Sequence, residues 1–153
     1  MSKGKKAGVI VCIIFIALTL GFIWGNSLLS KESSGKGSSR VYKFILPILD
    51  LFFGKGNITH AVFRKLIHFI EFFILALEFS ILFILLKGVK IKNLLYVLPI
   101  CLVTACLDES LQILSSRGAR VLDVLIDFSG SVFCCLIFLI IMLIANSKKQ
   151  KTT

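Results

Sequence analysis

The chain has little charge for its length. Only 17% of its 153 residues are Asp, Glu, Lys or Arg, whereas 57% are hydrophobic. This composition excludes an ordinary soluble domain, in which about a quarter of the residues are charged. Several continuous apolar runs reach roughly 20 residues, the length that crosses about 30 Å of hydrocarbon. They lack the alternation of a membrane β-barrel. We therefore predict an all-α, polytopic membrane protein.

Cysteine is present five times, an odd number, and always inside an apolar segment: Cys12, Cys101, Cys106, Cys134 and Cys135. This placement fits neither the spacing of a zinc site nor the loop positions of a disulfide framework. We interpret the five residues as small buried hydrophobes. The pattern H-E-x-x-H is also absent, which excludes a zinc protease of that type. We expect no cofactor.

Acidic residues are scarce: eight Asp and Glu against 18 Lys and Arg give a formal net charge of +10. The basic residues form no continuous face with interleaved aromatics, so we expect no nucleic-acid partner. They gather in three clusters: Lys3, Lys5 and Lys6; Lys87, Lys90 and Lys92; Lys148, Lys149 and Lys151. The positive-inside rule then predicts that both termini are cytoplasmic. The first outer loop is an exception, because it carries Lys31, Lys36, Arg40, Lys43 and Lys55.

The apolar runs predict four spans, about 7–28, 63–86, 93–114 and 119–145, within a single membrane domain over 1–153. The first run exceeds the core of a signal peptide and no clear cleavage site follows it, so we expect a retained helix.

Between the first two spans, residues 27–39 are typical of a flexible, water-exposed loop. We expect residues 40–53 to form a short interfacial helix, capped by Ser38 or Ser39 and interrupted at Pro47. The lipid bilayer is the predicted partner, and the sequence leaves the oligomeric state open.

Two polar sets accompany these apolar runs. The first opens the second span, and it comprises Arg64, Lys65, His68 and Glu71. The second joins the third and fourth spans, and it comprises Asp108, Glu109, Gln112, Arg117, Arg120, Asp123 and Asp127. Residues three or four apart share one helix face. Ionisable groups at membrane depth are costly unless they are paired, solvated or functional. We predict that both sets meet in one outward-facing polar pocket.

The chemistry of this pocket has several interpretations. The polar groups would fix helix register, or Arg64, Lys65, Arg117 and Arg120 would bind a phosphate of a lipid or surface polymer. Basic residues at helix ends also simply snorkel to the interface. His68 and the carboxylates suit a hard divalent ion, but the neighbouring cations disfavour a dedicated cage, so we predict no metal. No spacing singles out a nucleophile arrangement of Ser110, His68 and Asp123.

Three motifs in this order resemble the VanZ-like family. They are R-K-L-I-H-F-I-E-F-F-I-L at 64–75, L-D-E-S-L-Q at 107–112 and R-G-A-R-V-L-D-V-L-I-D-F-S-G at 117–130. The stretch W-G-N-S-L-L-S at 24–30 is similar to the first loop of that family. One departure is Phe72, where the family commonly has Tyr. VanZ-like proteins are bacterial membrane proteins, and the founding member is associated with low-level teicoplanin resistance.

The resemblance implies a protein of the bacterial cell envelope and adds Gly130 to the motif positions. We favour a non-enzymatic function, in which the pocket binds a surface or lipid headgroup and lowers susceptibility to teicoplanin-type glycopeptides. The alternative is an intramembrane enzyme that modifies a cell-wall precursor or lipid. In that case the catalytic candidates are His68, Glu71 and Asp108, because a buried carboxylate beside a histidine is suited to acid-base chemistry.

Overall fold

The computed structural model describes residues 2–115, 118 and 120–150 of the chain. The regular elements of this part are all helices: α1 (Lys3–Leu28), α2 (Lys31–Phe53), α3 (His60–Lys87), the short 3-10 helix η1 (Ile91–Asn93), α4 (Leu94–Leu114) and α5 (Val121–Gln150). Within it, four segments are long and apolar enough to cross a membrane: Lys3–Leu28, His60–Lys87, Ile91–Leu114 and Val121–Ala145. The prediction of an all-α, multi-pass membrane protein is confirmed.

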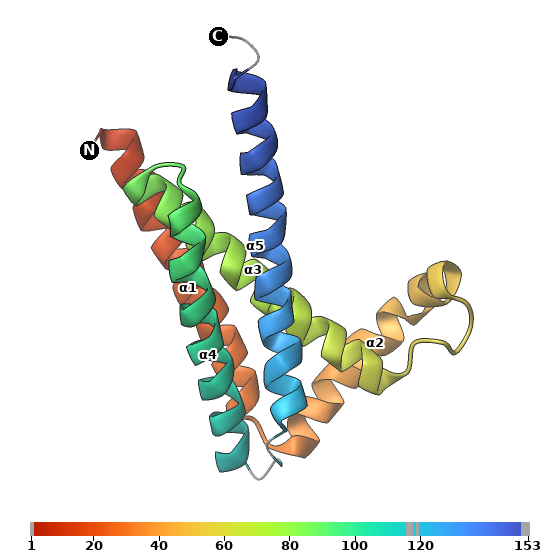
Figure 1. Cartoon of the computed structure of the whole chain (residues 1–153). Helices are drawn as coiled ribbons and strands as arrows, with labels where there is room; N and C mark the ends of the chain where they lie inside the picture. The colour runs from red at the N-terminus through yellow and green to blue at the C-terminus, as the bar shows by residue number, and fades with distance from the viewer. Residues whose placement is uncertain (1, 116–117, 119, 151–153) are drawn as a thin grey trace.

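Helices α1, α3, α4 and α5 form the bundle (Figure 1). Helix α3 crosses it obliquely and packs against α5 and α1, while α4 packs against α5 and α1. The N-terminus, the α3–α4 turn and the C-terminal end of α5 lie at one end of the bundle. The start of α3, the end of α4 and the start of α5 lie toward the other end, together with α2.

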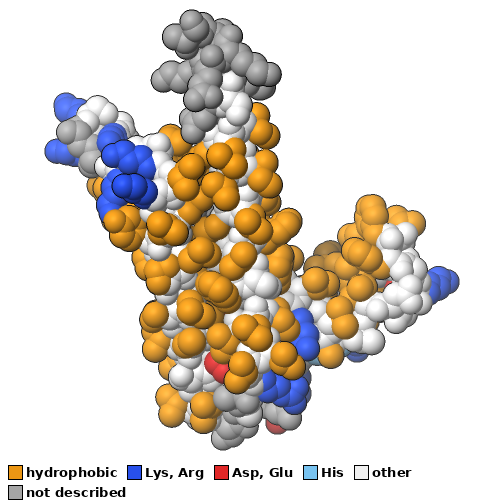
Figure 2. Space-filling view, in the orientation of Figure 1, with side chains coloured by type: hydrophobic (Ala, Val, Ile, Leu, Met, Phe, Trp, Pro, Cys, Tyr) orange, Lys and Arg blue, Asp and Glu red, His pale blue; other side chains and the backbone are white. Residues whose placement is uncertain are grey.

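The four helices bury a hydrophobic core that comprises Ile16, Ile23, Phe72, Leu75, Ala76, Leu94, Val97, Cys101, Ala105, Cys134 and Cys135. Large apolar side chains also remain exposed on the outside of the bundle, among them Leu18, Val103 and Ile140. Figure 2 shows that hydrophobic side chains cover the bundle along its length, with basic side chains toward its two ends. An apolar surface of this extent is what a lipid bilayer covers.

The interpretation of the cysteines holds for four of the five. Cys12, Cys101, Cys134 and Cys135 are buried free thiols, but Cys106 is exposed. It lies on α4 near Val103 and Leu107, which are themselves exposed apolar residues. The prediction that Cys106 is buried was therefore wrong, because its helix face points away from the bundle.

The expectation of a flexible loop over residues 27–39 was also wrong. Helix α2 begins at Lys31, nine residues earlier than predicted, and it continues through Pro47 to Phe53. The Ser30 side chain caps it by accepting the N–H of Ser33 at 3.3 Å. Lys36 and Glu32 form an ion pair one turn apart. These local contacts stabilise a helix in a segment whose Ser and Gly content alone indicated disorder.

Helix α2 is attached to the start of α3 by polar contacts. The Tyr42 hydroxyl donates to the backbone oxygen of Ile58 at 2.8 Å, and the Ser38 hydroxyl lies 3.0 Å from His60 Nε2. The large apolar residues Phe44 and Leu51 are 83% and 81% exposed, respectively. This uncovered apolar face suits a helix that lies in the membrane interface. The interfacial position stays a prediction, and it now applies to a longer helix than expected.

Candidate functional site

Polar residues of the two predicted sets lie at one end of the bundle, on three different helices. Arg64, Lys65, His68 and Glu71 lie in the first half of α3, whereas Asp108, Glu109 and Gln112 lie in the last turns of α4. Arg120, Asp123 and Asp127 stand just before α5 or in its first two turns. The crossing of α3 with α5 and the packing of α4 against α5 bring the three segments together.

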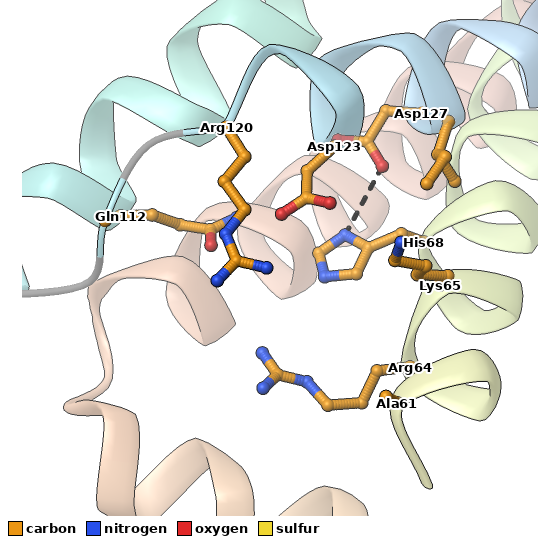
Figure 3. Close-up of a pocket in the computed structure, with 10 residues that line it drawn as sticks. Ala61, Arg64, Lys65, His68, Gln112, Arg120, Asp123 and Asp127 are labelled. Carbon is orange, nitrogen blue, oxygen red and sulfur yellow. Dashed lines mark ion pairs between the residues drawn. The ribbon is translucent and has the colours of Figure 1, made fainter. Parts of the chain in front are cut away.

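A pocket of about 220 Å³ lies between these segments. Its wall consists of Ala61, Arg64, Lys65, His68, Gln112, Gly118, Arg120, Asp123, Ile126 and Asp127. Figure 3 shows the guanidinium groups of Arg64 and Arg120 reaching into the pocket from different walls. Arg120 is exposed and Arg64 is half-buried, so both groups are within reach of a ligand that enters from the polar end.

Several acids lie near the cations of the pocket, but none of those that the structure describes forms an ion pair with them. Within the described ranges 2–115, 118 and 120–150, no ion pair joins Arg64, Lys65 or Arg120 to a carboxylate. A guanidinium group presents donors in a planar fork that matches the oxygens of a phosphate or carboxylate. The two arginines therefore leave the pocket equipped to bind an anion.

Beside this pocket, Asp108 is held in a fully buried polar network. The Ser27 hydroxyl of α1 donates to Asp108 Oδ1 at 2.6 Å, and the Gln112 amide donates to Oδ2 at 2.9 Å. Asp108 and Ser27 are 0% and 1% exposed. Because each carboxylate oxygen receives one donor, the side chain is fixed in place between α1 and α4.

Asp127 has a different environment. It is 1% exposed, and neither of its carboxylate oxygens has a hydrogen-bond partner among the described residues. His68 Nδ1 lies 3.5 Å from Asp127 Oδ1 and 3.7 Å from Glu71 Oε2, distances of ion pairs rather than of hydrogen bonds. A ring nitrogen of His68 and carboxylate oxygens of Asp108 and Asp127 all lie within 4.8 Å of one another.

Glu109 organises the connection between α4 and α5. Its Oε1 accepts the backbone N–H of Arg120, and the residue is 5% exposed. The contact ties the residue that precedes α5 to the last turns of α4. Glu109 therefore acts on the pocket by positioning Arg120, and its side chain is not part of the wall.

Gly130 permits the close crossing of α3 and α5. A Cβ atom at this position would lie 2.1 Å from the backbone oxygen of Phe69 and 3.2 Å from the backbone nitrogen of Phe73. One residue along, the Ser131 hydroxyl donates to the backbone oxygen of Phe72 at 3.2 Å. This backbone-to-backbone approach sets the distance between His68 on α3 and Asp127 on α5.

Comparison with known proteins identifies the family. A sequence model of the VanZ/LLP1 family matches residues 8–143, most of the chain. The chain belongs to the VanZ/LLP1 family. No curated protein and no solved structure matches it. The matched range of this VanZ/LLP1 protein includes every residue of the pocket wall.

The pocket of this protein contains part of the predicted residue set. The predicted residues that form its wall are Arg64, Lys65, His68, Gln112, Arg120, Asp123 and Asp127. Glu71, Asp108 and Glu109 do not form the wall. Arg117, the remaining predicted residue, lies outside the described residues.

Only part of the predicted catalytic set lies at the pocket, and the nucleophile arrangement is not formed. Of His68, Glu71 and Asp108, only His68 lines the pocket. Ser110 is exposed, and its hydroxyl donates to the backbone oxygen of Cys106 within α4. A Ser110 nucleophile beside His68 and Asp123 is therefore contradicted, because Ser110 faces away from the bundle.

Ser27 contacts the candidate site through Asp108, but the sequence predicted the wrong environment for it. It was predicted to begin a water-exposed loop, yet it is buried in the last turn of α1 and bonds to Asp108. The signal in the sequence was its position within W-G-N-S-L-L-S, the stretch that resembles the family's first loop. Hydropathy alone does not distinguish a buried serine from one in a loop.

Proposed function

We propose that this VanZ/LLP1 protein binds an anionic headgroup, of a lipid or of a cell-wall polymer, in an outward-facing pocket of the bacterial cell membrane. In doing so it lowers susceptibility to teicoplanin-type glycopeptides. The observation that carries this proposal is the pair of guanidinium groups, Arg64 and Arg120, which reach into the pocket and have no carboxylate partner among the described residues.

The distribution of basic residues supports the outward direction. The clusters at Lys3–Lys6 and Lys87–Lys92 lie at the end of the bundle opposite the pocket. Under the positive-inside rule that end is cytoplasmic, which places the pocket at the outer face. Helix α2, which carries basic residues of its own, then lies on the outer side.

The size of the pocket supports a headgroup as the ligand. A volume of about 220 Å³ accommodates a phosphate with its nearest substituent and is too small for a glycopeptide antibiotic. We therefore propose that the effect on the drug is indirect. The protein would occupy or reorganise anionic groups at the membrane surface, and the approach of the drug to that surface would change.

The proposal predicts a selective change in drug susceptibility. Expression of the wild type in a sensitive Gram-positive host is expected to raise the inhibitory concentration of teicoplanin but not that of vancomycin. Arg64→Gln and Arg120→Gln are each expected to return it to the empty-vector level, because each removes a charge-assisted contact worth about 1.5–3 kcal/mol. Lys43→Gln, on exposed α2 and outside the pocket wall, is the matched control.

Two results would count against this function. Unchanged resistance in both arginine variants, at membrane levels equal to the wild type, would remove the pocket from the mechanism. A chemical change in extracted lipids or wall fragments that Glu71→Gln abolishes would favour the enzymatic alternative instead.

A further inference from the structure

We infer that His68, Asp108 and Asp127 form a binding site for one divalent transition-metal ion of the Mn²⁺ to Zn²⁺ class, on the bundle side of the pocket. This goes beyond the proposed anion binding and does not depend on it. It also revises our expectation from the sequence that no metal is bound.

The first argument is the state of Asp127. Its carboxylate is 1% exposed and lines the pocket, and in the described part of the chain neither oxygen receives a hydrogen bond. A carboxylate oxygen of Asp108 lies within 4.8 Å of one of Asp127, and His68 Nδ1, 3.5 Å from Asp127 Oδ1, carries a charge only when it is protonated. Buried like charges that are not fully compensated cost several kcal/mol. A cation between the carboxylates would remove this cost.

The second argument is the geometry of the three side chains. One ligand atom from each lies within 4.8 Å of the other two. Ligand atoms about 2.1 Å from a shared ion lie roughly 3–4 Å apart, so small rotamer changes close the site. One imidazole nitrogen with two carboxylate oxygens is a donor set that suits Zn²⁺ or Mn²⁺.

The third argument is the support around Asp108. Ser27 and Gln112 each donate to one of its oxygens, at 2.6 and 2.9 Å. Metal-binding carboxylates are oriented in this way by outer hydrogen-bond donors, which leave further lone pairs for the ion.

Three of the four nearby basic residues are not paired with the carboxylates of this site among the described residues. Sequence reasoning rejected a metal because Arg64, Lys65, Arg117 and Arg120 are close to the carboxylates. Arg64, Lys65 and Arg120 line the pocket and form no ion pair with an acid in the part of the chain that the structure describes, and Arg117 lies outside that part. Positive groups thus lie toward the opening, and the buried carboxylates lie behind them.

The test uses full-length protein in detergent, purified with a tag free of histidine and stripped with EDTA. Co²⁺ is added as the probe, and binding is followed by visible absorption and by metal content after buffer exchange. We expect the wild type to retain one equivalent, which Zn²⁺ displaces. Asp127→Asn is expected to weaken binding at least about 100-fold, and Ser27→Ala about 10-fold.

Controls separate loss of ligands from loss of fold. Glu32→Gln removes an acid of α2 outside the pocket wall, and the Arg64→Gln/Arg120→Gln double variant removes only the anion contacts. The first is expected to bind Co²⁺ like the wild type, and the second at least as tightly. If Asp127→Asn does not elute as a folded species, His68→Gln takes its place. Retention of less than about 0.1 equivalent by the wild type would overturn the inference. So would equal binding by Asp127→Asn, which would mean an adventitious ion only.

Discussion

Replacement of Gly130 by alanine is expected to destabilise the protein by about 3 kcal/mol or more, and to lower its level in the membrane. The added Cβ would lie 2.1 Å from the backbone oxygen of Phe69, well inside van der Waals contact. Backbone cannot move aside as a flexible side chain can, so α3 and α5 must separate. That separation also breaks the hydrogen bond from Ser131 to Phe72.

The melting temperature in detergent, together with membrane accumulation, measures this effect. Gly21→Ala is the matched control, because a Cβ on that α1 glycine meets nothing within 4 Å. Alanine at such a helical position is expected to stabilise by up to about 1 kcal/mol. A melting temperature for Gly130→Ala equal to that of Gly21→Ala would show that the α3–α5 crossing is wider than described.

Replacement of Ser27 by alanine is expected to cost about 2 kcal/mol of stability. The variant removes a 2.6 Å hydrogen bond between residues 81 positions apart, and it leaves a fully buried oxygen of Asp108 without its donor. Few other polar contacts join the end of α1 to α4 in the part of the chain that is described. Loss of the hydrogen bond between Ser27 and Asp108 therefore loosens the polar network beside the pocket.

The control for Ser27→Ala is Ser129→Ala on α5. The Ser129 hydroxyl is exposed and donates to Ile126 within its own helix, so its removal is expected to change stability by less than about 0.5 kcal/mol. Thermal unfolding of both variants in the same detergent gives the comparison. Equal melting temperatures would indicate that Asp108 does not depend on Ser27.

The membrane architecture was predictable because hydrophobicity over roughly 20 residues is a strong local signal. The four helices that are long and apolar enough to cross a membrane begin and end within four residues of the expected spans. The start of the last span, predicted at residue 119, lies outside the described residues. The family was likewise predictable from motifs such as L-D-E-S-L-Q. Helical spacing also predicted that Asp108 and Gln112 share one face, and both are buried.

What could not be predicted depends on contacts between distant segments. Nothing local to Ser27 shows that Asp108 lies beside it, and nothing local to Gly130 shows that the backbone of Phe69 does. Helix α2 was missed for a different reason: a serine cap and an ion pair offset a Ser- and Gly-rich composition. The separation of exposed cations from buried carboxylates is likewise a property of the packed helices.

Direct binding of an anionic headgroup is the measurement that tests the central proposal most closely. Purified protein in detergent is titrated with phosphatidylglycerol and, in a second arm, with a soluble glycerol-phosphate oligomer, so that lipid and polymer sources are distinguished. The variants are Arg64→Gln/Arg120→Gln and, as a control with the same loss of charge outside the pocket wall, Lys43→Gln/Lys55→Gln. We expect at least about tenfold weaker binding for the arginine pair in at least one arm, since each 1.4 kcal/mol is a factor of ten. The lysine pair is expected to change binding less than about twofold. Equal binding by the arginine pair and the wild type in both arms would contradict an anion pocket between α3 and α5.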